Sequence, residues 1–320
     1  MDKRLTLNQT ISSTTANAGH RGTLVRRVVQ AAAAILLLTT AALPASAESS
    51  VWQASKGDST VFLGGTIHLL RPQDYPLPGA FEAAYQSSER LFFEIDQSQL
   101  TDMSVQARMM QRLMYQDGRT LQSVLDEEAY TALAGYTEEA GLPMAMIQNF
   151  KPGLLLSTLS VIEFQSMGFT PQGVDAYYNA RAMDDGKVRG ELETIDQQIG
   201  LLEAMGEGYE SEFVLYSLRD LETAGQAMEE MLAAWRTGDQ AQLEAQFINP
   251  MREETPQLYD SMLVVRNNNW MPQIEAMFDE PGTEFVLVGA AHLVGEHGLL
   301  AMLSERGYEV STVAAEASDE

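Results

Sequence analysis

VFLGGTIHL, residues 61–69, is repeated near the other end of the chain as FVLVGAAHL, residues 285–293. Both copies are apolar strands that end in Gly-x-x-His-Leu. Each is followed by a helical pattern that ends in Ser-Glu-Arg, and then by another strand. We therefore predict two β-α-β units, one at each end of the chain, which lie side by side in one sheet.

The two ends of the chain carry the strand signals. Residues 51–70 predict two strands around a Gly57-Asp58 turn, because the second strand is rich in β-branched and aromatic residues. A helix over 79–88 and a strand over 91–95 complete the first unit. The second unit is predicted as a strand over 283–290, a helix over 295–306 and a strand over 308–313.

The middle of the chain is helical in pattern. Apolar residues recur at three- and four-residue spacing over about 101–186 and again over 194–278, with a short strand near 187–191 between them. Pro143, Pro152 and Pro171 are expected in the first turns of new helices, and Thr194 begins a capping box. The fold class predicted is α/β, with a mostly mixed central sheet and a large helical insertion.

The first 47 residues have the form of an export signal. Basic residues precede an apolar run over 28–43, and Ala45-Ser46-Ala47 supplies the small residues of a cleavage site. The run falls short of the ~20 apolar residues that a spanning helix needs. We predict cleavage after Ala47, a periplasmic or secreted location without stable membrane insertion, and one domain over 48–320.

Charge and composition exclude several classes of function. Residues 48–320 contain 15 basic and 44 acidic residues, a net charge of −29, which argues against nucleic acid as a partner. The chain has no cysteine, so disulfides and thiol catalysis are excluded. It also lacks the motifs of conventional serine hydrolases, zincins, nucleoside triphosphatases and dinucleotide-binding enzymes.

The repeat predicts a site where the strands end. His68 and His292 should face the crevice outside the carboxyl ends of parallel strands, and Gly65 and Gly289 let the backbone approach a ligand closely. Glu94 lies among apolar strand residues, where a carboxylate is costly unless it is paired or bound to a metal. Two imidazoles and a carboxylate would suit a divalent ion such as Mn, Co or Zn, which activates water and polarises carbonyls.

Structural interpretations of the same residues stay open. Either histidine could be a hydrogen-bonded core or rim residue, and Glu94 could form a salt bridge with Arg90 or Arg266. We expect His297 to be a loop histidine at the rim rather than a metal ligand.

The chain resembles the TraB/GumN family, which is related to the Tiki proteins and more distantly to erythromycin-esterase-like and ChaN-like folds. The resemblance covers about 51–313. It is carried by these motifs in order: Val51-Trp52, Gly65-Thr66-Ile67-His68, Phe93-Glu94-Ile95-Asp96, Lys151-Pro152, Gly173-Val174-Asp175-Ala176-Tyr177, Glu191-Leu192-Glu193-Thr194, Arg266-Asn267 and Gly289-Ala290-Ala291-His292-Leu293. It implies a metal-dependent, hydrolase-like site, because Tiki proteins are similar to metalloproteases that depend on the paired histidines.

Within that resemblance, His68, Glu94 and His292 would be the metal ligands. Glu193 and Arg266 would be catalytic residues that support them, Glu193 as a general base and Arg266 by holding an oxyanion or a substrate carboxylate. Asn267 would join Gly65 and Gly289 in binding substrate. Glu193 could instead be a carboxylate favoured by the dipole of the next helix, and Arg266 could stack on Trp270. Asp175 and the Lys151-Pro152 pair are expected to serve helix starts and packing.

These features predict an exported metal-dependent hydrolase that acts on a peptide or another small molecule, a peptidase being one candidate. The second reading is a non-catalytic periplasmic binding or accessory protein for a peptide, a glycan intermediate or a tetrapyrrole. For the bacterial members of the family, the resemblance implies no established substrate.

Overall fold

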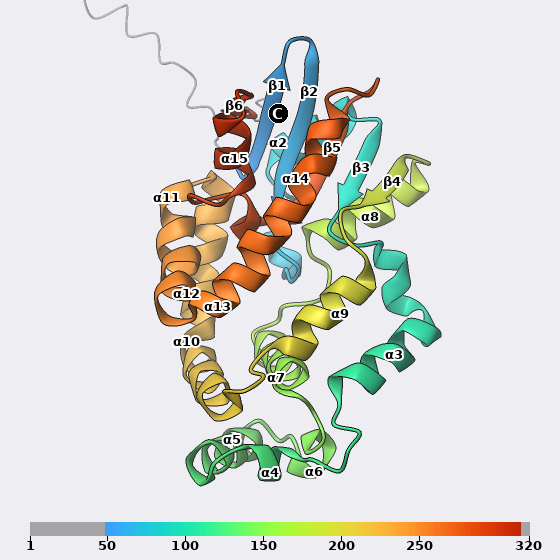
Figure 1. Ribbon diagram of the computed structural model, residues 1–320. Coiled ribbons are helices and arrows are strands. Elements are labelled where there is room, and N and C mark those ends of the chain that lie inside the picture. Colours follow the sequence, from blue (N-terminus) through green and yellow to red (C-terminus); the bar gives the residue numbers. More distant parts are fainter. Residues whose placement is uncertain (1–48, 315–320) are drawn as a thin grey trace, which may run out of the picture. The chain divides into compact units, whose positions relative to one another are not determined.

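The computed structural model describes residues 49–314 (Figure 1). The predicted leader and its cleavage point after Ala47 lie outside this range. Within the described residues, no helix combines the length and the apolar character that crossing a bilayer requires. The predicted α/β class is confirmed, since many helices surround a single mixed sheet of six strands.

The sheet brings the two ends of the chain together. Its strands lie in the order β4-β3-β5-β2-β1-β6. The pairs β2–β5, β5–β3 and β3–β4 are parallel, whereas β1 is antiparallel to both of its neighbours. The strands are β1 (Val51–Lys56), β2 (Ser59–Thr66), β3 (Arg90–Phe93), β4 (Val188–Glu191), β5 (Glu284–Gly289) and β6 (Glu309–Thr312).

The opening hairpin forms where the sequence predicts it. β1 and β2 pair from Val51 with Gly64 to Lys56 with Ser59, which leaves Gly57 and Asp58 as a two-residue turn. Gly57 has a φ of 63°, a conformation that glycine adopts without steric cost and that tight hairpin turns require.

Helices cover both faces of the sheet (Figure 1). α2 (Gly79–Ser87) and α8 (Val174–Asp184) lie on one face, where the rings of Phe81 and Tyr178 pack against Phe285 of β5. α14 (Val265–Met277) and α15 (Leu299–Glu305) cover the other face. The central strand β5 is therefore buried on both faces, as its continuous apolar sequence predicts.

The helical insertion lies below the carboxyl ends of the parallel strands in Figure 1. It has an apolar cluster of its own, in which α10 packs against α5 and α7. Its helices are α3 (Met103–Leu113), α4 (Leu121–Val124), α5 (Glu127–Glu139), α6 (Met144–Ile147), α7 (Pro152–Ser166), α8, α9 (Ile195–Ala204), α10 (Glu210–Thr237), α11 (Gln240–Leu243), α12 (Asn249–Glu254) and α13 (Pro256–Tyr259). Two π-helical turns, η3 (Glu244–Ile248) and η4 (Asp260–Val264), interrupt the later part.

Most predicted helix starts are confirmed, and one is wrong. Thr194 caps α9 through a reciprocal bond pattern with Gln197, and Pro152 is the first residue of α7. Pro143 immediately precedes α6. Pro171, in contrast, lies outside any first turn, because α8 begins at Val174.

Glycines explain both the start of α8 and the late start of α15. A Cβ at Gly173, the residue before α8, would lie 2.2 Å from the carbonyl oxygen of Ile67, so only glycine allows this contact with the end of β2. The predicted helix over 295–306 is shortened to Leu299–Glu305. Gly295 has a φ of 83°, and the chain turns there before the helix begins.

Candidate functional site

The two Gly-x-x-His segments leave the sheet side by side. β2 and β5 are parallel neighbours, and Thr66 pairs with Gly289 at their carboxyl ends. Glu94 directly follows β3, the strand on the other side of β5. Topology alone therefore brings His68, Glu94 and His292 to one edge of the sheet.

Arg266 of α14 connects two acidic residues to one of the histidines. Its Nη2 donates to Glu94 Oε2 at 2.5 Å and to Glu193 Oε1 at 2.7 Å. Its Nη1 donates to His292 Nε2 at 2.8 Å and to the carbonyl oxygen of Met262 at 3.3 Å. We call Glu94, Glu193, Arg266 and His292 the Arg266 cluster.

Arg266 lies on the buried face of α14, which follows the π-helical turn η4. Leu263, Arg266 and Trp270 are buried at three- and four-residue spacing, whereas Val265 is exposed. The guanidinium also stacks over the ring of Trp270, 4.6 Å from its centroid, so the expected packing role and the polar role are combined.

Charge in the cluster is not balanced. Glu94, Glu193 and Arg266 are each less than 9% exposed, so two carboxylates share one guanidinium in a buried setting. Burial alone would raise the pKa of Glu94, but the Arg266 charge and the Gly289 N–H bond, at 2.7 Å, lower it to about 2. The three side chains carry a net charge of −1, which favours another cation nearby.

His292 is buried and neutral. Burial lowers its pKa to about 3. Because Arg266 can only donate, His292 Nε2 accepts, and the ring proton is on Nδ1, 2.7 Å from Asn267 Oδ1. Asn267 Nδ2 donates to the carbonyl oxygens of His292 and His297.

His68 lies in a different environment. Its side chain is 63% exposed, and its Nδ1 lies 3.1 Å from Asp175 Oδ1. The Asp175 carboxylate raises the pKa of His68 to about 9, so the ring is cationic at neutral pH. Gln97 holds the other oxygen of Asp175 at 2.7 Å.

Some roles predicted from sequence change in the structure. Asn267 is buried behind His292 and orients its ring, so its polar atoms are not directed at substrate. Gly65 packs against Ala290, since a Cβ there would lie 3.1 Å from the Ala290 Cα. Gly289 does line the cavity and holds Glu94 through its N–H. Glu193 lies behind Arg266.

The structure contains two contacts that the sequence did not predict, one made by Asp175 with His68 and one made by Gln198 with Glu94. Asp175 starts α8 as expected, but its carboxylate also bonds to His68. Gln198 of α9 donates to Glu94 Oε2 at 3.2 Å. The glycine immediately before α8 is the one sequence feature that could have indicated the first contact.

The ion pairs of Glu94 and Arg90 are separate. Glu94 pairs with Arg266, whereas Arg90 binds Glu280 and Glu284 at the opposite end of the sheet. His297 lies 2.8 Å from the hydroxyl of Tyr259 and does not line the cavity described next.

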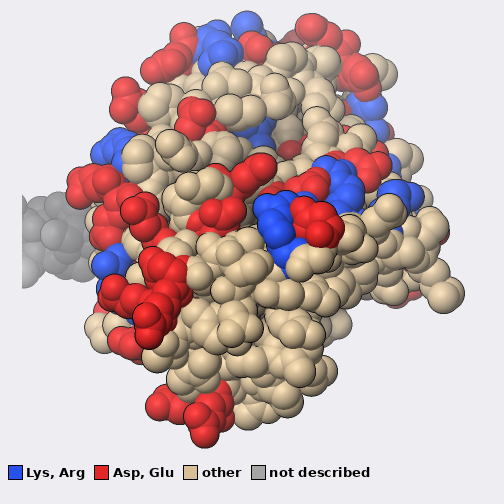
Figure 2. Space-filling view, turned by 60° about the horizontal axis from the view of Figure 1, so that its bottom comes forward, with Lys and Arg blue, Asp and Glu red and all other residues tan. Residues whose placement is uncertain are grey.

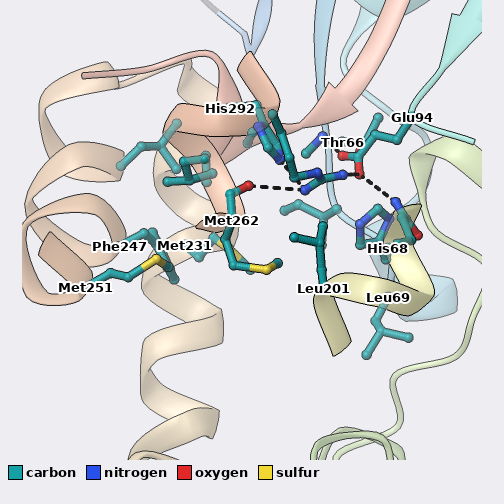
Figure 3. Close-up of a pocket in the computed structure, with 18 of the residues that line it drawn as sticks. Thr66, His68, Leu69, Glu94, Leu201, Met231, Phe247, Met251, Met262 and His292 are labelled. Carbon is teal, nitrogen blue, oxygen red and sulfur yellow. Dashed lines mark hydrogen bonds and ion pairs between the residues drawn. The ribbon is translucent and has the colours of Figure 1, made fainter. Parts of the chain in front are cut away.

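A cavity of about 450 Å³ opens beside these residues. His68, Glu94, Arg266, Gly289 and His292 form its polar end. Its apolar walls come from α9, α10 and the segments around η3 and η4, as Figure 3 shows for Leu201, Met231, Phe247, Met251 and Met262. The size is typical of a small-molecule site.

The side chains fit a divalent ion in kind but not in their present arrangement. Arg266 occupies the lone pairs of Glu94 Oε2 and His292 Nε2, and His68 is protonated. Over 49–314, no three histidine, aspartate or glutamate side chains are placed to share one ion. A metal could bind Glu94 and His292 only after the guanidinium moves.

Comparison with known proteins gives two kinds of relative. The model of the TraB/PrgY/gumN family matches residues 50–312. Metalloprotease TIKI2 of Danio rerio is 25% identical over 78% of this chain and 57% of its own length. The chain therefore spans little more than half of that relative. The uncharacterized protein YbaP of Escherichia coli (strain K12) is 24% identical over 77% of this chain and 89% of its own length. No solved structure matches.

Proposed function

The chain belongs to the TraB/PrgY/gumN family, and on this premise we propose that it is an exported hydrolase that cleaves a peptide or ester bond at the polar end of the cavity. The observation that carries the proposal is the convergence of His68, Glu94 and Arg266 on one cavity wall. The similarity to Metalloprotease TIKI2 supports the reaction class.

The three residues offer complementary chemistry to a carbonyl substrate. The cationic His68 ring, oriented by Asp175, can donate a proton to the leaving group. Arg266 donates its hydrogen bonds to Glu193, Glu94, His292 and Met262, and its positive charge can stabilise the oxygen on which negative charge develops. Glu94 faces the cavity and can accept a proton from the attacking water. Asn267 and Glu193 fix His292 and Arg266 from behind.

A divalent ion (Mn, Co or Zn) is part of the proposal. The net negative charge of the Arg266 cluster and the relative's description as a metalloprotease support it. The ion and the Arg266 guanidinium would compete for the same atoms of Glu94 and His292. Periplasmic or secreted location is proposed from the leader, and fractionation of cells that produce the full chain would test it.

Metal binding and hydrolysis are tested together on the mature protein. After treatment with a chelator and dialysis, metal content and cleavage of peptide and ester libraries are measured with Mn, Co and Zn added back in turn. We expect His68→Ala and His292→Ala to reduce both metal uptake and turnover. His297→Ala is the matched control, because His297 is outside the cavity. Metal uptake that is absent, or equal in all four proteins, would remove the metal from the proposal.

A binding protein without catalysis is the second candidate. It is favoured by the hydrogen bonds from Arg266, which occupy Glu94 and His292 in the structure. This function predicts that ligands bind in the cavity while every metal and substrate combination gives no turnover, and that Glu94→Gln leaves ligand affinity nearly unchanged.

A further inference from the structure

The apolar part of the cavity carries information about substrate that the polar cluster does not. Its lining includes five methionines, at positions 205, 228, 231, 251 and 262, together with Phe247. Methionine side chains are flexible and polarisable, so such a lining adapts to chains of variable shape. A rigid, branched ligand would not need this adaptability.

The size of the cavity sets the size of the occupant. A cavity of roughly 150 Å³ is enough to hold benzene, and this one measures about 450 Å³. A single amino-acid side chain would leave much of it unfilled. An extended aliphatic chain would fill it and would remain in contact with thioether and aromatic groups along its length.

Thr66 adds a hydroxyl group to the lining of the cavity. It is 3% exposed, lines the cavity, and its hydroxyl has no hydrogen-bond partner among the described residues. An unpartnered buried hydroxyl is unfavourable, so it marks a place where a ligand can supply the acceptor.

We infer that the substrate is an acyl ester or amide whose aliphatic chain occupies the methionine-lined cavity and whose carbonyl accepts a hydrogen bond from Thr66 at the polar end. This inference rests on the proposed function, because it places the scissile bond at the polar end. Water adds to the carbonyl carbon, the acyl C–O or C–N bond breaks, and the leaving alcohol or amine takes a proton. The acyl chain is released as a carboxylate.

Binding is tested separately from turnover. Displacement of a fluorescent fatty acid from the mature protein is measured with butyrate, octanoate and dodecanoate as competitors. Hydrolysis of the matching p-nitrophenyl esters is followed in parallel. We expect affinity and kcat/KM to rise at least tenfold from butyryl to the longer chains.

Two variants fill the cavity from different helices. Met231→Trp on α10 and Leu201→Trp on α9 should lower affinity for dodecanoate at least tenfold and should lower kcat/KM for the dodecanoyl ester by a larger factor than for the butyryl ester. Met103→Trp is the matched control, because Met103 is 84% exposed and lies outside the cavity. Thr66→Val should weaken binding of both long and short carboxylates.

The outcomes separate this inference from the proposed function. Chain-length-dependent binding without hydrolysis would keep the acyl site and overturn the enzyme. Hydrolysis of peptides with no chain-length dependence, or equal binding by wild type and both tryptophan variants, would overturn the acyl site and leave the hydrolase standing.

Discussion

The two Gly-x-x-His segments share a short motif, Gly-x-x-His-Leu, but their histidines have opposite chemical states. His292 is 4% exposed and neutral, between Asn267 and Arg266, whereas the His68 side chain is 63% exposed and cationic beside Asp175. The repeat places both rings at the ends of parallel strands. Side chains from the helical insertion and from α14 then decide which ring carries a proton. A repeated motif thus fixes position, and its partners fix protonation.

Exposed and buried charges differ in the same way elsewhere in the molecule. Acidic side chains are spread over the face shown in Figure 2, with basic ones among them. These groups are solvated and screened. The Arg266 cluster instead has its excess negative charge inside, where it has large consequences for stability and metal binding.

Among the substitutions around His292, the removal of Arg266 should have the largest effect on stability. Arg266→Met leaves two buried carboxylates without a partner and should lower the free energy of unfolding by about 3–5 kcal/mol. Urea unfolding of the metal-free protein measures it. The control Arg219→Met breaks the exposed pair with Glu254 and should cost less than about 1 kcal/mol.

Addition of a divalent metal tests whether the ion and the Arg266 guanidinium compete for the same site. If the guanidinium and a divalent ion compete for Glu94 and His292, Mn should restore part of the stability that Arg266→Met loses. Wild type should gain less, because its own arginine occupies the site. Equal gains in both proteins would contradict the competition.

Asn267 is expected to come next, because it accepts the Nδ1 proton of His292 and bonds two carbonyl oxygens. Asn267→Leu leaves the Nδ1 proton and two carbonyl oxygens without their partner and should cost about 3 kcal/mol. Asn268→Leu, one residue later on the exposed side of α14, should stay within about 0.5 kcal/mol of wild type. Nitrogen-detected NMR should show a shifted His292 Nδ1 signal in the first variant alone, because the Nδ1 proton loses its acceptor while Nε2 still accepts from Arg266.

Patterns that depend on near neighbours predicted much of this molecule. The strands and the buried Glu94 follow from apolar runs, and α9 follows from its capping box at Thr194. The placement of Glu94 near both histidines follows from parallel strands sharing one edge. These inferences need only local sequence and the rules of sheet topology.

The partners of the two histidines could not be predicted in this way. Asp175 is 107 residues from His68, and its helix pattern looks the same whether its carboxylate faces solvent or an imidazole. Arg266 lies on the buried face of α14, but helical spacing alone does not reveal that side chains from distant segments, Glu94 and His292 among them, meet it there. Packing between distant segments decides both contacts.

The two glycines of the repeat should respond unequally to the same substitution. Gly65→Ala places a Cβ 3.1 Å from the backbone of Ala290, which cannot move alone, and should cost about 1 kcal/mol or more. Gly289→Ala meets two side-chain atoms, Glu94 Oε1 at 3.3 Å and His292 Cδ2 at 3.7 Å. We expect little change in thermal stability there, but a shift in the His292 NMR signals. Equal losses of thermal stability in Gly65→Ala and Gly289→Ala would contradict the expected difference between the two glycines.

The smallest effect on stability is expected from His68, where pH separates the two rings. Its folded-state pKa of about 9 is above the ordinary value of 6.5, so its stabilising pair with Asp175 is fully present below about pH 6.5 and is lost as pH rises through 9. Because the ring is largely exposed, solvent screening keeps this contribution small. In the metal-free protein, NMR titration should give a His68 midpoint near 9 that falls toward 6.5 in Asp175→Asn. His292, with a pKa of about 3, should show no titration above about pH 5 in either protein. If Asp175→Asn leaves the His68 midpoint unchanged, Asp175 of the helical insertion does not set the charge of the His68 ring.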